Sequence, residues 1–182
     1  MSILMHWLNS CYLILFNALL RSNFFFSTQH PKRNVNSIYF DDLSYSSIRQ
    51  NLDGVSEKVK YRIRWYDSKN VLNKPNFEIK SKKGFESYKK LFDLKELNNL
   101  SLLQYENLEY IKEFINNKFG FYKTLYPILT AHYDRDYFLS NNGLIRATLD
   151  YNLQSVSLEN NRDLNLIKNY YSTITLELKY PI

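Results

Sequence analysis

The chain has 182 residues, which is enough for one globular domain with its own hydrophobic core and too few for two full domains. Its formal net charge of +6 favours anionic partners such as phosphates, nucleic acid or membrane lipids, and four glycines and four prolines are too few for a flexible linker. The single cysteine, Cys11, excludes an internal disulfide and favours a reducing cytoplasm, and three scattered histidines exclude a zinc motif.

Residues 1–30 are expected to form an apolar N-terminal helix, and residues 31–182 a single domain. The helix is expected to be amphipathic and to pack on the domain, because apolar side chains recur at helical spacing at Leu8, Tyr12, Leu15 and Leu19. The continuous apolar run is shorter than the roughly 20 residues that a membrane-spanning helix needs. A signal peptide would require a lysine or arginine before this run, and none is present. A cryptic signal or a mis-started reading frame is the alternative.

From residue 35 onward apolar and polar residues mostly alternate, and this period of two indicates β-strands. The Asn142-Gly143 pair is a strong signal for a hairpin turn between two of them. The expected strands are residues 35–41, 58–66, 77–82, 88–94, 131–139, 144–153 and 172–180.

Two helices are expected between the strands. A short one at residues 43–50 has Asp41 or Asp42 near its start, where a carboxylate can accept hydrogen bonds from free backbone N–H groups. A longer one at residues 102–117 is expected to cover one side of the sheet, and Ser101 with Gln104 forms a candidate capping box. Its apolar stripe contains Leu103, Ile111, Phe114 and Ile115.

One expected strand carries positive charge along a whole face. In residues 58–66, four apolar side chains alternate with the cations Lys58, Lys60, Arg62 and Arg64. A charged strand face is usually only a solvated face. Here other strands add more cations, and such clustering costs stability unless an anion binds there. The added cations are Lys80, Lys82, Arg146 and Lys179.

Closing the sheet into a barrel would point these cations into a tunnel, while the apolar faces pack under outer helices. The expected fold class is therefore α+β, an antiparallel β-barrel with helices packed outside. A few acids are interleaved with the cations, namely Glu78, Asp150 and Glu177. A carboxylate beside phosphate-binding cations can hold a divalent metal ion, which takes oxygen ligands and bridges phosphate oxygens.

Several strand motifs occur in one characteristic order. They lie at residues 35–41 (Val-Asn-Ser-Ile-Tyr-Phe-Asp), 53–54 (Asp-Gly), 59–66 (Val-Lys-Tyr-Arg-Ile-Arg-Trp-Tyr), 77–80 (Phe-Glu-Ile-Lys), 133–138 (Tyr-Asp-Arg-Asp-Tyr-Phe), 145–146 (Ile-Arg, with Asp150) and 176–181 (Leu-Glu-Leu-Lys-Tyr-Pro). Together these motifs resemble the VTC domain, the polyphosphate polymerase domain named after the vacuolar transporter chaperone complex. This family is a branch of the triphosphate tunnel metalloenzymes.

The resemblance implies an eight-stranded tunnel that binds ATP and polyphosphate and transfers the γ-phosphate of ATP to the polyphosphate chain, with a manganese or magnesium ion. Four catalytic residues are implied to bind the triphosphate: Arg62, Arg64, Lys80 and Lys89. The expected substrate-binding residues are Lys58 and Lys60 at the tunnel mouth, and Arg135, Arg146 and Lys179. Glu177 is implied as the metal-binding glutamate, and Glu78 is a second candidate.

Two of these residues have simpler alternatives. Arg135 is flanked by Asp134 and Asp136, so it could form only surface ion pairs, which are common and weak. Asp150 could simply pair with Arg146. Tyr39, Tyr61 and Trp65 are expected to be packing residues.

Two parts of the family pattern are missing from the sequence: a first strand with a Glu-x-Lys motif, and a C-terminal segment whose lysines close the tunnel. We therefore expect an incomplete tunnel, and a second chain or a membrane-associated protein is a candidate partner. A noncatalytic polyphosphate-binding or triphosphate-binding module is the alternative function. Specific nucleic-acid binding is not expected, because no recognition helix or stacking motif is found. The expected location is the cytoplasm, either free or at the cytoplasmic face of a membrane.

Overall fold

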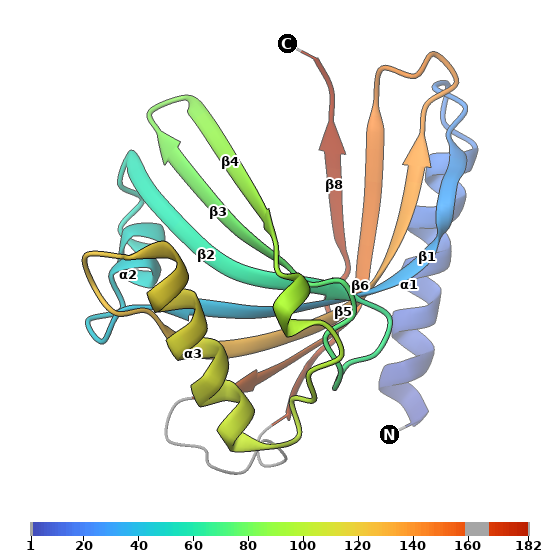
Figure 1. Cartoon of the computed structure of the whole chain (residues 1–182). Helices are drawn as coiled ribbons and strands as arrows, with labels where there is room; N and C mark the ends of the chain where they lie inside the picture. The colour runs from blue at the N-terminus through green and yellow to red at the C-terminus, as the bar shows by residue number, and fades with distance from the viewer. Residues whose placement is uncertain (1, 159–167, 182) are drawn as a thin grey trace. The chain divides into compact units, whose positions relative to one another are not determined.

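The computed structural model describes residues 2–158 and 168–181 (Figure 1). Its strands are β1 (Ser27–Asp41), β2 (Glu57–Tyr66), β3 (Asn76–Lys83), β4 (Glu86–Asp93), β5 (Tyr126–Leu139), β6 (Arg146–Ser157), β7 (Lys168–Tyr171) and β8 (Thr175–Lys179). Its helices are α1 (Ser2–Leu20), α2 (Ser46–Leu52) and α3 (Tyr105–Phe119), with a 3₁₀ turn at Lys95–Leu97. The α+β class expected from the sequence is therefore confirmed.

The eight strands form one sheet in the order β4-β3-β2-β1-β5-β6-β7, and β8 pairs with β6. The pairs β2–β3, β3–β4 and β6–β8 are antiparallel, as expected. No pair among the described strands joins the two ends of this order, so the closed barrel expected from the sequence is not confirmed. The chain divides into two compact units, a larger one (Asn36–Ala131 and Ser155–Lys168) and a smaller one (Met1–Val35, His132–Gln154 and Asn169–Ile182).

Two strands begin well before their expected start, and one strand was not expected. β1 begins at Ser27 rather than at residue 35, because its first eight residues are polar or proline and carry no apolar alternation. β5 begins at Tyr126, before Pro127, and a proline is tolerated at the start of a strand, where its missing N–H costs least. β7 was not expected at all, since Lys-Asn-Tyr-Tyr gives no periodic signal.

The core of the larger unit lies on one face of β1, β2 and β3. Alternation along β2 buries Ile63 and Trp65 completely, while Arg62 and Arg64 point to the opposite face. Phe77 of β3 is also fully buried and lies within a cluster of aromatic rings. The neighbouring rings are Phe40, Tyr61, Phe119 and Phe121.

α3 covers this core with the residues Leu108, Ile111 and Ile115, which share one helix face. Leu103 was expected in this stripe, but the helix begins only at Tyr105, so Leu103 lies before it and is exposed. The expected capping box is also wrong. The helix cap is Gln104 and makes no side-chain capping bond, and the Ser101 hydroxyl accepts instead from the Leu103 N–H.

The smaller unit contains α1 and a second, smaller core. Leu19 of α1 is buried there with Phe138, Ala147 and Leu149, and Tyr12, Leu15 and Phe16 pack against them. The expected packing of Tyr12, Leu15 and Leu19 is thus confirmed, whereas the side chain of Leu8 lies outside the described residues. In the part of the chain that the structure describes, none of the helices combines the length and hydropathy needed to cross a membrane.

Replacing Phe77 by alanine is expected to lower the free energy of unfolding by about 3–5 kcal/mol, because a buried ring and its aromatic contacts are lost and a cavity remains. Chemical denaturation followed by circular dichroism measures the change. The matched control is Phe85→Ala in the β3–β4 turn, where the ring is fully exposed and a change within about 0.5 kcal/mol is expected. Equal effects of the two substitutions would contradict the assigned core.

Candidate functional site

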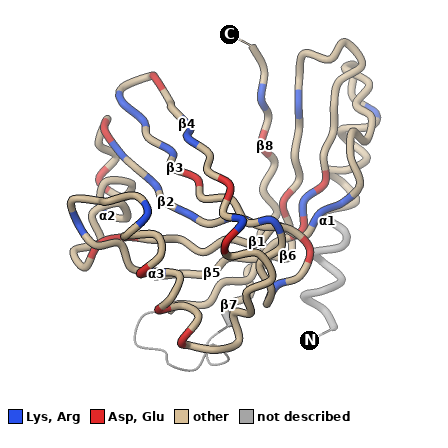
Figure 2. The backbone as a smooth tube through the Cα atoms, in the orientation of Figure 1, with Lys and Arg blue, Asp and Glu red and all other residues tan. Residues whose placement is uncertain are grey.

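The polar faces of β2, β3 and β4 carry the cations expected from the sequence, and Figure 2 shows Lys and Arg recurring along these three strands. The register places them directly opposite one another: Lys58 faces Lys82, Lys60 faces Lys80, and Lys80 faces Lys89. We call Lys60, Lys80 and Lys89 the lysine row. Like charges directly opposite on neighbouring strands destabilise a sheet. The row is therefore a place where a bound anion would relieve repulsion.

On the same face, two residues before Lys80 along β3, one carboxylate forms ion pairs with three cations. Glu78 lies directly opposite Arg62, and its side chain is only 5% exposed. Arg62 donates from Nε to Oε2 of Glu78 at 2.7 Å and lies with NH2 at 2.5 Å from the same atom. Lys89 Nζ donates to Oε1 at 3.0 Å, and Arg64 NH1 is 3.7 Å from that oxygen. This carboxylate holds both arginines and one end of the lysine row.

The surrounding charges lower the pKa of Glu78 and raise the pKa of Arg62. Burial by itself raises the pKa of Glu78, but the charges of Arg62 and Arg64 and the bond from Lys89 outweigh it and hold this pKa below its ordinary value. Burial likewise lowers the pKa of Arg62, and the interactions with Tyr39 and Glu78 outweigh it, so the pKa of Arg62 is raised. Both groups are ionised at neutral pH.

The two arginines differ in what they can still offer to a ligand. The edge of Arg62 formed by Nε and NH2 is taken by Glu78, and its NH1 donates to the Tyr39 hydroxyl at 3.4 Å. The buried Nε of Arg64 has no hydrogen-bond partner among the described residues. A buried charged donor without a partner is costly. Arg64 thus keeps one donor that no described residue uses.

The smaller unit holds the remaining predicted residues. Arg135 forms a two-bond ion pair with Asp150, from Nε at 2.5 Å and NH2 at 2.6 Å. Burial lowers the pKa of Arg135, but Asp150 outweighs it and the pKa is raised. The simpler alternatives named the wrong partners: Asp150 pairs with Arg135 rather than with Arg146, and Arg135 is held in an ion pair, but with Asp150 rather than with its flanking acids. Asp134 and Asp136 are sequence neighbours of Arg135 and so point to the other face of β5.

Across β6 and β8, Arg146 lies opposite Lys179 and Thr148 opposite Glu177. Arg146 forms no ion pair with a described residue, so of these two facing cations only Lys179 pairs with a described acid. Glu177 is 46% exposed and lies 3.3 Å from Lys179. The buried hydroxyl of Thr148 has no hydrogen-bond partner among the described residues.

The predicted site residues thus form two groups, one in each unit. The larger unit brings together Arg62, Arg64 and Lys89 around Glu78, with Lys58, Lys60 and Lys80 on the same face. The smaller unit contains Arg135, Arg146, Glu177 and Lys179. Tyr39 was expected only to pack, but it also contacts Arg62, and a tyrosine on a strand gives no sequence signal for that contact.

The carboxylates differ in how well they suit a metal ion. Within residues 2–158 and 168–181 no group of three or more His, Cys, Asp or Glu side chains could hold one. Glu78 is already neutralised by three cations, which would repel a divalent ion. Glu177 is exposed and has a single lysine beside it. Magnesium is commonly held by one or two carboxylates together with substrate phosphates, so Glu177 fits such an ion better.

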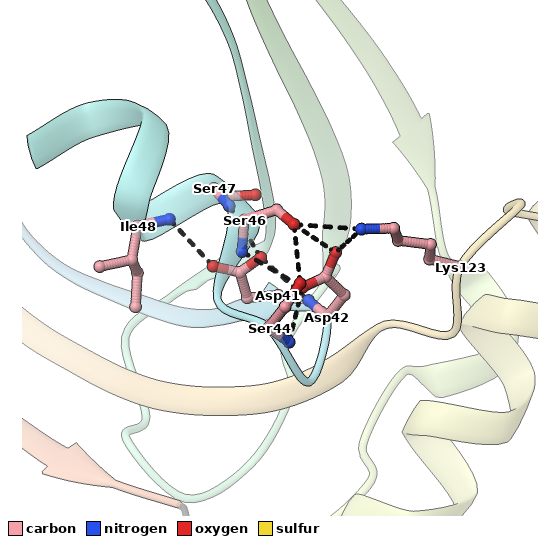
Figure 3. Close-up of polar contacts among 7 residues, drawn as sticks. All are labelled: Asp41, Asp42, Ser44, Ser46, Ser47, Ile48 and Lys123. Atoms are coloured by element: carbon pink, nitrogen blue, oxygen red, sulfur yellow. Dashed lines mark hydrogen bonds and ion pairs between the residues drawn. The ribbon is translucent and has the colours of Figure 1, made fainter. Parts of the chain in front are cut away.

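A second polar network fixes α2 beside the sheet (Figure 3). Asp41 accepts the N–H groups of Ser47 at 2.9 Å and Ile48 at 3.0 Å, which confirms the expected acid at the start of this helix. Asp42 accepts the Lys123 ammonium at 2.8 Å and the Ser46 hydroxyl at 2.6 Å. Burial alone would raise the pKa of Asp42, but these bonds hold it well below its ordinary value.

Replacing Glu78 by glutamine is expected to lower the free energy of unfolding by about 3 kcal/mol at neutral pH, because Arg62 and Arg64 then lack their counter-charge in a largely buried site. Urea denaturation measures the difference. Glu57→Gln is the matched control, since the Glu57–Lys83 pair is exposed and is worth less than about 1 kcal/mol. Equal stabilities of the two variants would contradict the role given to Glu78.

The same carboxylate predicts the pH dependence of stability. Because its pKa is lower in the folded chain than the ordinary 4.5, its stabilising effect is fully present above pH 4.5 and is lost as the pH falls through the folded value. Below pH 4.5 the wild type should therefore lose unfolding free energy more steeply than Glu78→Gln. Urea denaturation at a series of pH values measures this difference. If the unfolding free energies of the two proteins fall in parallel with pH, the protonation of Glu78 does not contribute to the pH dependence of stability.

Comparison with known proteins identifies the family of the chain. A family model described as the VTC domain matches residues 9–181, which is nearly the whole chain. The match begins inside α1 and extends through β8, so it includes both units. No curated protein matches the chain. The chain belongs to the VTC domain family.

Proposed function

We propose that this chain is a polyphosphate polymerase-like protein that binds a nucleoside triphosphate and polyphosphate on its cationic strand faces and transfers the γ-phosphate of ATP to the polyphosphate chain. The observation that carries the proposal is the lysine row, in which Lys60 faces Lys80 and Lys80 faces Lys89, and of the three only Lys89 pairs with a described acid, Glu78. Membership of the VTC domain family supports the reaction class.

In this reaction a terminal oxygen of the polyphosphate forms a bond to the γ-phosphorus, the bond between the γ-phosphorus and the bridging oxygen breaks, and ADP leaves with that electron pair. Phosphoryl transfer leaves little covalent work for side chains, so the protein contributes positioning and charge neutralisation. The lysine row and Arg64 would hold phosphate oxygens in the larger unit. Arg146 and Lys179 would hold them in the smaller unit.

A divalent ion, manganese or magnesium, is part of the proposal, and Glu177 is the carboxylate that would hold it together with substrate phosphates. Such an ion neutralises charge on the phosphate oxygens during transfer. The closed tunnel is also a proposal, supported by the family match and by the cationic faces in both units. ATP and polyphosphate are the proposed ligands, and the cytoplasm is the proposed location.

The purified chain is expected to convert ATP into polyphosphate when manganese is present. Arg64→Lys should lower the rate roughly 100-fold, because lysine keeps the charge but lacks the planar set of donors, and Glu177→Gln should do the same through the metal ion. Polyphosphate formation is followed on gels and ADP release by chromatography. Binding of ATP and polyphosphate without turnover would support a noncatalytic binding module instead.

The lysine row also predicts a conflict between stability and binding. Lys80→Gln should raise the free energy of unfolding by roughly 0.2–1 kcal/mol at low salt, because it removes a charge that faces lysines on both sides, and should weaken tripolyphosphate binding. Thermal denaturation and calorimetry measure the two effects. The control is Lys90→Gln, whose side chain lies opposite Ile79 on the other face of the sheet and should leave binding unchanged. Equal losses of binding would exclude the row as the phosphate site.

A further inference from the structure

The outer side of α1 carries apolar side chains where a surface helix ordinarily carries charges. One side of α1 packs on the sheet through Leu19, but Leu13 and Ile14 on the other side are 54% and 65% exposed. The whole helix contains no Asp, Glu, Lys or Arg. A helix at a protein–water boundary usually places such residues on its outer face. The outer side of α1 is therefore suited to contact with an apolar medium.

The turn that follows α1 exposes two aromatic rings. Phe24 and Phe25 are 54% and 69% exposed. The turn is nevertheless fixed, because the Phe25 N–H donates to the Ser22 carbonyl at 2.9 Å and the Ser22 hydroxyl donates to the Leu19 carbonyl at 2.8 Å. Phe25 has a φ of 48°, in the left-handed region that phenylalanine rarely adopts. The chain thus keeps a strained backbone at a position where the ring is mostly in solvent.

A second segment brings another apolar side chain to this end of the smaller unit. The N–H of Asn141, in the turn between β5 and β6, donates to the Phe24 carbonyl at 3.1 Å, so the two turns lie side by side (Figure 1). Leu144, in the same hairpin turn, is 58% exposed. We call Phe24, Phe25 and Leu144 the apolar tip. Single exposed apolar residues are normal on a soluble protein, whereas a group of them indicates a binding surface.

The charges in the segments that form the apolar tip all have one sign. Residues 1–40 and 137–149 contain no Asp or Glu. Their four cations are Arg21, Lys32, Arg33 and Arg146. Lys32 pairs with Asp134, whereas Arg21 is exposed directly after α1, beside the turn that carries the two rings. This combination matches a membrane that contains anionic lipids, because its interface takes up apolar side chains and its headgroups attract Lys and Arg.

We propose that the apolar tip and the outer side of α1 bind the surface of a membrane that contains anionic lipids. Phe24, Phe25 and Leu144 enter the boundary between headgroups and acyl chains, and Arg21 contacts the anionic headgroups. The proposal goes beyond the proposed function and does not depend on it, since the apolar tip and the lysine row consist of different residues.

Co-sedimentation of the full chain with lipid vesicles tests the proposal. The wild type should bind vesicles of phosphatidylcholine mixed with phosphatidylserine more tightly than vesicles of phosphatidylcholine alone, and high salt should reduce the difference by screening the charges. Phe25→Asn removes one ring and keeps the turn, because asparagine tolerates the left-handed conformation. Together with Leu144→Ser it should weaken binding to the mixed vesicles about tenfold or more. Arg21→Gln should weaken it about fivefold at low salt.

Two control variants separate this surface from other features of the chain. Phe85→Asn makes the same substitution at a fully exposed ring of the larger unit and should leave vesicle binding unchanged. Lys80→Gln should also leave it unchanged, which would show that the lysine row is not what binds the vesicles. Circular dichroism melting shows whether each variant folds.

Three results would overturn the proposal. The first is a wild type that does not bind the mixed vesicles, or binds both kinds of vesicle equally. The second is a folded Phe25→Asn/Leu144→Ser variant that binds the mixed vesicles as tightly as the wild type. The third is a wild type that binds no vesicles but forms a dimer in size-exclusion chromatography, which the double variant loses. The apolar tip would then be an interface between two copies of this chain.

Discussion

The larger unit depends on one buried carboxylate. Glu78 is 4% exposed as a residue and is the acid toward which Arg62, Arg64 and Lys89 converge from β2 and β4. Without it, two arginines would lie largely buried on a strand face that carries mostly lysines. Breaking such a buried charge network leaves uncompensated charge, which is far more costly than losing a surface pair. Glu78 therefore makes it possible for the sheet to keep its arginines at the centre of the site.

Glu78 balances only part of this face. It pairs with Lys89, but Lys60 and Lys80 face each other, and Lys58 faces Lys82, without an ion pair to a described acid. A strand face optimised only for stability would pair these lysines with acids, because cross-strand charge pairs of opposite sign stabilise a sheet. The chain instead keeps the repulsion between facing lysines, although the neighbouring acid, Glu78, already pairs with three cations. This uneven balance is the reason for proposing that the face binds an anion.

The sequence predicts well what depends on periodicity alone. Alternation along residues 58–66 correctly separates the buried Ile63 and Trp65 from the cations, and the acid at the start of α2 is correct. It fails where the signal is absent or not local. The polar first half of β1 has no pattern to detect, and the partner of Arg135 depends on the pairing of β5 with β6, which brings Asp150 to it across the sheet.

The most informative features of the candidate site depend on contacts between strands, which the sequence does not show. That Lys60, Lys80 and Lys89 form a row depends on the register of β2 with β3 and of β3 with β4, and a slip of one residue would move each set of side chains to the other face. Single strands show only that cations alternate, not which cations meet. The same holds for Tyr39, whose hydroxyl contact with Arg62 joins residues on different strands.

The spacing of the row also argues for a long or composite ligand. Neighbouring strands lie about 4.8 Å apart, so three strands span roughly 10 Å from Lys60 to Lys89. A single phosphate group can contact only part of that length, whereas a chain of phosphates can follow it and relieve repulsion at each strand.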